Sequence, residues 1–210
     1  MKKLEYGLNS ISVDKLFSPI QSRNDVILVM LEIVRLITYG INVPKNKASG
    51  KMLLRIDKMN RIFLFSKNKY YSMLFPFSLI TNKNQNIVYG INNATFDNEI
   101  IALLLRFFKK DSLSSLDNAL ELALLLDEEN DSFCDEKTVW RLVHTLLSFE
   151  PGYLRYDNDQ KNVKSIHPAS HLDINFTNTG KIKIGLENTI SNKDFIDIVN
   201  TQTIPWELKK

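Results

Sequence analysis

The spacing of hydrophobic residues changes along this chain, from a helical period in its middle to strict alternation after residue 150. Leu142 and Leu146 lie four residues apart, as on one buried face of a helix. Leu172 and Ile174 instead alternate with polar residues, the pattern of a strand with one buried face. The sequence therefore predicts an α+β fold. The expected parts are an N-terminal α/β segment (1–95), a helical segment (96–150) and a β-rich segment (151–210), which could together form one domain.

The N-terminal segment is expected to begin with a helix. Its apolar run from Val26 to Ile37 can be capped by Ser22 or Asn24 and stopped by Gly40. A β-hairpin is expected after it, because two β-prone runs flank a polar tetrad that can form a turn. The runs are Met52–Ile56 and Arg61–Phe65, the tetrad is Asp57–Asn60, and Tyr70–Leu74 is a candidate third strand.

A group of helices is expected in the middle of the chain. Asp97 is the N-cap of the first helix, and Ser114 or Ser115 begins the second. Asp135 caps a third helix, which Pro151 ends. These segments are expected to be mainly structural.

The C-terminal segment is expected to form an antiparallel three-stranded sheet followed by a final helix. Its strands cover residues 153–157, 171–176 and 181–185, with a hairpin turn at 177–180 and a helix from Asn192 to about Asn200. Directly opposed residues share a face, so a register that pairs Leu172 and Ile174 with the isoleucines leaves polar residues on the other face. That polar set is His171, Asp173 and Asn175 near Lys181, Lys183 and Gly185, joined by Arg155 and Asp157 if their strand pairs alongside.

Charge is segregated along the sequence, although the formal net charge is only +3. Residues 111–136 carry nine acidic side chains and no lysine or arginine. Residues 45–69 carry a single acidic residue, Asp57. The basic residues of that stretch are Lys45, Lys47, Lys51, Arg55, Lys58, Arg61, Lys67 and Lys69. Such poles suit binding to a nucleic acid or to a charged protein partner, and a solvated surface is the plainer alternative.

The chain is expected to be a cytoplasmic protein that does not enter a membrane. Cys134 is its only cysteine, which excludes an intramolecular disulfide and a multi-cysteine zinc site. The first residues do not have the pattern of a cleavable signal peptide. Glu32 and Arg35 interrupt the longest apolar run, which is also shorter than a bilayer requires.

Two of the three histidines lie in the C-terminal segment among carboxylates and a guanidinium. The candidate catalytic residues are His167, His171, Asp157, Asp173 and Arg155. A divalent metal is one candidate ligand, with His167, His171 and Asp159 as donors. The spacing is not that of a zincin, because Pro168 follows His167 where a helix with glutamate would be needed. The sequence assigns no cofactor beyond this candidate metal.

Metal-free cleavage of a phosphodiester is a second chemistry open to these residues. One histidine would act as general base and the other as acid, while Arg155 or Lys183 stabilises the developing charge. A nucleophilic Ser170 is a weaker alternative, since no glycines of a nucleophile elbow surround it. In a purely structural interpretation, Asp173 pairs with a cross-strand lysine and the histidines bond to the backbone at a bend.

The run Arg155-Tyr156-Asp157-Asn158-Asp159, followed by His167-Pro168-Ala169-Ser170-His171-Leu172, resembles the C-terminal pattern of uncharacterised bacterial proteins filed as domains of unknown function. Their genes are often associated with phage-defence or mobile regions. The resemblance covers about the last sixty residues. It implies a component of a bacterial conflict system and brings no established activity with it.

Two functions follow as hypotheses. The first is a non-catalytic interaction subunit of a bacterial defence or toxin-like assembly, which binds a protein partner from the same gene cluster, nucleic acid, or both. The alternative is a hydrolase, either a nuclease or a nucleotide phosphodiesterase. In it His167 and His171 are acid and base or metal ligands, Asp157 and Asp173 orient them, and Arg155 holds phosphate.

Overall fold

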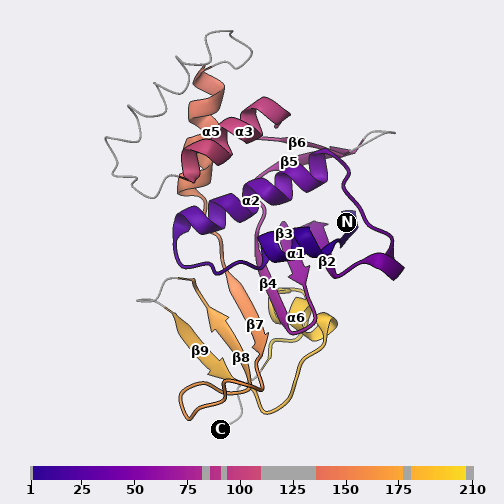
Figure 1. Cartoon of the computed structure of the whole chain (residues 1–210), viewed down its shortest axis with the longest axis vertical. Helices are drawn as coiled ribbons and strands as arrows, with labels where there is room; N and C mark the ends of the chain where they lie inside the picture. Colours follow the sequence, from indigo (N-terminus) through magenta and orange to yellow (C-terminus); the bar gives the residue numbers. More distant parts are fainter. Residues whose placement is uncertain (1, 82–85, 91–93, 110–135, 177–180, 207–210) are drawn as a thin grey trace. The chain divides into compact units, whose positions relative to one another are not determined.

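A computed structural model describes residues 2–81, 86–90, 94–109, 136–176 and 181–206 (Figure 1). The chain divides into two compact units, each assembled from separate stretches of sequence. Unit 1 contains residues 1–17, 42–75 and 150–210, and unit 2 contains residues 18–41 and 76–149. The expected segments were consecutive, whereas the strands of unit 1 come from both ends of the chain.

Unit 1 is built on a seven-stranded antiparallel sheet with the order β1-β2-β3-β4-β7-β8-β9. The strands are β1 (Lys2–Leu8), β2 (Gly50–Ile56), β3 (Arg61–Phe65), β4 (Lys69–Leu74), β7 (Leu154–Asn158), β8 (Ser170–Ile174) and β9 (Ile182–Gly185). The mixed α+β class, the β2–β3 hairpin and the three C-terminal strands are confirmed. The C-terminal strands do not form a sheet of their own, because β7 pairs with β4 and so continues the N-terminal sheet.

One face of this sheet is apolar and is packed against α6 (Asn192–Ile198). Ser191 caps the helix in a capping box with Asp194, whose carboxylate accepts from the Ser191 backbone amide. Phe195 is fully buried, and its ring lies 6.4 Å from that of Phe63 and 5.8 Å from that of Tyr70, centroid to centroid. Tyr156 of β7 and Leu172 of β8 belong to the same buried cluster, so this core also holds those two strands.

The opposite face is apolar over the N-terminal strands and polar over the C-terminal ones. Beside α1 (Ser10–Leu16), the ring of Phe17 lies 5.2 Å from that of Tyr71, whose hydroxyl donates to the Leu16 carbonyl. Across the sheet Tyr71 is paired with Arg155, and Arg155 is paired with Asp173. The change from tyrosine to arginine and aspartate along one cross-strand row marks where the polar residues begin.

Unit 2 contains three described helices and a two-stranded sheet. The elements are α2 (Arg23–Thr38), α3 (Asn98–Phe108), α5 (Glu136–Ser148), β5 (Ser78–Thr81) and β6 (Asn86–Tyr89). Of the two predicted caps for α2, Ser22 caps the helix and Asn24 lies inside it. The predicted Asp97 cap of α3 is confirmed, and each capping side chain accepts from a backbone amide in the first turn. The helix expected after Ser114 or Ser115, the Asp135 cap and the 177–180 turn lie outside the described residues. Among the described helices, none combines the length and the apolar character needed to cross a membrane.

Candidate functional site

The candidate site is the polar part of one sheet face, referred to here as the polar face. Its members are Lys69, Arg155, Asp157, His171, Asp173, Lys181 and Lys183, with His167 from the loop before β8. Asp157 is paired with His171, and Asp173 is paired with Lys183. The predicted register is confirmed, because Leu172 lies opposite Ile184 and Ile174 lies opposite Ile182.

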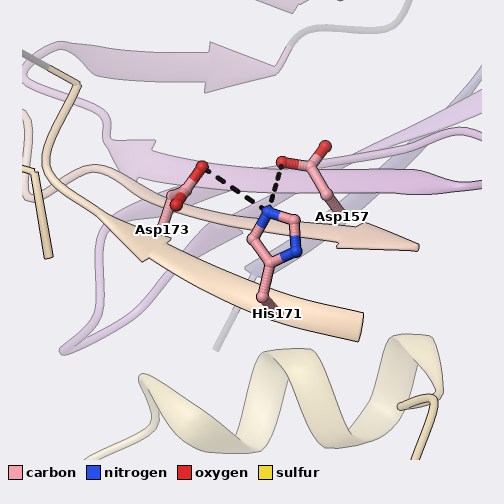
Figure 2. Close-up of side chains that lie close together, drawn as sticks. All are labelled: Asp157, His171 and Asp173. Atoms are coloured by element: carbon pink, nitrogen blue, oxygen red, sulfur yellow. Dashed lines mark ion pairs between the residues drawn. The ribbon is translucent and has the colours of Figure 1, made fainter. Parts of the chain in front are cut away.

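His171 is completely buried at the centre of the polar face. Its Nδ1 lies 2.8 Å from the carbonyl oxygen of Pro168, and since a carbonyl only accepts, Nδ1 carries the proton. The free lone pair of the neutral ring is therefore on Nε2. Figure 2 shows two carboxylates near this nitrogen, with Oδ2 of Asp157 at 3.6 Å and Oδ2 of Asp173 at 3.9 Å.

Lys183 connects the two histidines. Its ammonium lies 3.0 Å from Nε2 of His171 and 3.2 Å from Nδ1 of His167, so it can donate to both rings. Burial lowers the pKa of His171, and the charge of Lys183 lowers it further, against the Pro168 contact and the two carboxylates. His171 is consequently a neutral imidazole near pH 7.

Both carboxylates are paired with cations. The Arg155 guanidinium spans them, with Nε 2.5 Å from Asp157 Oδ2 and an Nη atom on Asp173. Lys181 Nζ lies 3.1 Å from Asp173 Oδ2. Burial opposes ionisation of Asp173, yet the hydrogen bond from Lys181 and the charges of Arg155 and Lys183 hold its pKa below the usual value.

The cations form the accessible layer of the polar face. The Asp173 side chain is 0% exposed and that of Asp157 13%, whereas Arg155 is 17%, Lys183 26% and Lys181 27% exposed. Lys69, 35% exposed, joins them from β4, with Nζ 4.0 Å from Asp157 Oδ1. These four cations exceed the two carboxylates that they contact, so an incoming anion meets a positive surface.

A divalent metal does not fit this arrangement as it stands. Asp157, His171 and Asp173 each offer one ligand atom, and these atoms lie within 4.8 Å of one another. The same atoms already face cations, because Lys183 contacts Nε2 of His171 and lies 3.5 Å from Oδ1 of Asp173, while Arg155 spans both carboxylates. A metal would have to displace Lys183. Of the predicted donors, His167 approaches Asp159 at 4.0 Å, between Nε2 and Oδ2.

Ser170 is separated from the histidines by the sheet. It neighbours His171 in β8, and successive side chains of a strand point to opposite faces. Its hydroxyl is buried and lies 3.2 Å from the Tyr156 hydroxyl and 3.1 Å from the Asn188 carbonyl. The structure thus provides no Ser170–His171 pair.

The predicted basic stretch is distributed over several environments. Lys45, Lys47, Lys58 and Lys67 are exposed. Lys51 and Arg55 form ion pairs with Glu5 and Asp57, on the sheet face opposite Lys69. Arg61 is buried, which lowers its pKa to about 10, and it donates to Ser72 and to the Gly152 carbonyl.

Sequence reasoning placed Lys69 in that basic stretch and not at the candidate site. The alternation of β4 indicates which face Lys69 occupies, but not that β4 pairs with β7. Tyr153 is a second residue without an assigned role. It is buried beside the site, where burial raises its pKa to about 12 despite the nearby Arg155 charge, so it remains a phenol.

Fold and site together define a mixed α+β protein with a seven-stranded antiparallel sheet and a cation-rich histidine site on one of its faces. Comparison with protein-family models, with curated proteins and with solved structures gives no match. The resemblance of the C-terminal pattern to bacterial proteins of unknown function therefore stays a prediction.

Proposed function

We propose that the polar face binds the phosphates of a nucleic acid and cleaves phosphodiester bonds by acid–base catalysis. The observation that carries this proposal is the position of Lys183, whose ammonium lies within 3.2 Å of a ring nitrogen of both histidines. Two imidazoles and a cation at one point are the groups that proton transfer to and from a phosphodiester needs.

The two histidines differ in surroundings, which suits different roles. His171 is buried, neutral and fixed by its Nδ1 contact, so we assign it as the general base acting through Nε2. His167 is 32% exposed, and a carboxylate oxygen of Asp159 lies near its ring. His167 is the more accessible of the two imidazoles, so we assign it as the general acid that reaches the leaving oxygen.

Lys183 and Arg155 stabilise charge in this proposal. A bound phosphate oxygen competes with the imidazoles for the Lys183 ammonium and draws it away, which frees the lone pair of His171 Nε2. Asp157 and Asp173 are positioning residues, because their carboxylates accept hydrogen bonds from Arg155 and so hold its guanidinium in place. No step of this scheme passes through a metal ion.

The test is cleavage of end-labelled single-stranded and duplex RNA and DNA by the purified protein. His171→Gln should lower the rate about 10²–10⁴-fold, the usual contribution of a general base. His144→Gln is the matched control, because His144 is exposed on α5 in unit 2, and its rate should not change. Equal rates for wild type and His171→Gln, at equal melting temperature, would refute the catalytic role.

A non-catalytic interaction subunit is the second candidate function. Lys45 and Lys47, in the short 3₁₀ helix η1 (Lys45–Lys47), are both exposed, as expected of a surface that contacts phosphates or an acidic protein. Under this hypothesis Lys45→Glu with Lys47→Glu abolishes association and leaves any cleavage unchanged. The bacterial defence setting and a partner from the same gene cluster belong to this candidate and stay predictions.

A further inference from the structure

We infer that the polar face acts on RNA, using the 2′-hydroxyl of the substrate as the nucleophile, and leaves a 2′,3′-cyclic phosphate and a 5′-hydroxyl. This inference rests on the proposed function. It depends on which group in the described part of the site could attack phosphorus.

The described protein groups near the histidines do not supply a nucleophile. The Ser170 hydroxyl is buried on the other face of the sheet. Tyr153 has a pKa of about 12, so its phenolate is scarce at neutral pH. The amines of Lys181 and Lys183 are engaged as cations beside Asp173.

Attack by water would need stronger activation than this site offers. A neutral imidazole is a weak base toward water, and metal-bound hydroxide is the usual remedy. The donor atoms that a metal would need are held by Lys183 and Arg155. A hydroxyl built into the substrate removes the difficulty, since an intramolecular nucleophile has an effective molarity of about 10⁵–10⁸ M.

The step is balanced with the groups present. His171 Nε2 takes the proton of the 2′-hydroxyl as the bond from the 2′-oxygen to phosphorus forms. The bond from phosphorus to the 5′-oxygen breaks, and protonated His167 gives its proton to that leaving oxygen. Lys183 and Arg155 face the charge that accumulates on the non-bridging oxygens. Proton exchange with solvent then restores both histidines.

The extent of the cationic layer favours a polymer over a single nucleotide. Lys69 lies on β4 and Lys181 precedes β9, and these strands are separated by β7 and β8. Three strand spacings of about 4.8 Å place β4 and β9 about 14 Å apart, more than one phosphate can span. Lys69 and Lys181 are therefore assigned to phosphates on either side of the cleaved bond.

The experiment compares four strands of one sequence with the full-length wild-type protein: RNA, DNA, 2′-O-methyl RNA, and DNA with a single internal ribonucleotide. We expect cleavage of the RNA, and of the mixed strand only after its ribonucleotide. The DNA and the 2′-O-methyl RNA should remain intact, and mass spectrometry should find a 2′,3′-cyclic phosphate. These results need no mutant, so they do not depend on whether a variant folds.

The possible outcomes distinguish attack by the 2′-hydroxyl from phosphodiester cleavage in general. Cleavage of the DNA, or of the 2′-O-methyl RNA, would overturn the inference and leave phosphodiester cleavage standing. RNA products with a 5′-phosphate would do the same, because they require attack by water. If none of the four strands is cut, the proposed function and the inference both fail.

Discussion

His171 takes its neutral form from its immediate neighbours. Its carbonyl partner and its burial are fixed by the fold, and the Lys183 ammonium opposes a second proton on the ring. We expect the acid limb of the cleavage profile, log(kcat/KM) against pH, to lie below the ordinary histidine pKa of 6.5. Replacing Lys183 by Gln removes one cause of the lowered pKa, so the limb should move to higher pH; a limb that stays in place would contradict this account.

The same lowered pKa makes stability depend on pH. Unfolded His171 takes up a proton as the pH falls through 6.5, whereas folded His171 takes it up only at a lower pH. Protons therefore favour the unfolded chain in that window, and the free energy of unfolding should decrease as the pH falls through it. Denaturant melts between about pH 7.5 and pH 5 measure this slope, which should be smaller in His171→Gln. Asp173 does not add to it, because its pKa lies below 3.8.

Asp173 should be the most costly polar residue of the site to remove. Asp173→Ala leaves Arg155, Lys181 and Lys183 without their shared carboxylate, and breaking a buried ion pair costs about 3–5 kcal/mol. The three cations are partly exposed, so we expect the lower end, about 3 kcal/mol, by urea denaturation. Asp159→Ala, on the loop before His167, is the control and should cost much less, because exposed ionic contacts contribute little to stability. Equal losses for the two variants would rule out the buried network as a source of stability.

At the scale of elements, Phe195 is the fully buried side chain of α6 on the apolar face of the sheet, and Ile196 and Ile198 are partly buried against the same core. Phe195 contacts the rings of Phe63, Phe65 and Tyr70 and is fully buried. Phe195→Ala should lower the free energy of unfolding by about 3–5 kcal/mol. Ile204→Ala, at a position 88% exposed, should leave it nearly unchanged. A small effect of Phe195→Ala would mean that α6 contributes little to the fold.

The sequence was most informative where one strand or one helix could be interpreted alone. Alternation gave β7, β8 and β9 and the face shared by Asp157, His171 and Asp173, because side-chain parity is a local property. Strand β1 was missed, although Leu4, Tyr6 and Leu8 alternate in it. Parity does not say which strands are neighbours. The sequence therefore could not predict the β4–β7 pair or the position of Lys69 at the site.

At the scale of the whole molecule, linear charge proved a poor guide to surface charge. The basic stretch contains exposed lysines, paired cations and the buried Arg61, while Lys69 belongs to the polar face. Two surfaces therefore compete as the nucleic-acid contact. Lys69→Gln with Lys181→Gln should weaken RNA binding and reduce its slope against log salt by about 2, one for each lost phosphate contact. If Lys45→Gln with Lys47→Gln has this effect instead, the contact lies at η1 and not at the polar face.

The pairing of β4 with β7 also has a consequence for how the chain folds. Strands β2 to β4 and strands β7 to β9 can each pair with their neighbours in the sequence. The β1–β2 pair closes over residues 9–49, and the longest loop is 75–153, which must close before Tyr70 meets Tyr156. Closing so long a loop is entropically costly and slows the contacts that depend on it. Lys69 joins Arg155 on the polar face only through that pairing. RNA binding that depends on Lys69 should therefore appear in the last kinetic phase of refolding, after most of the secondary structure has formed.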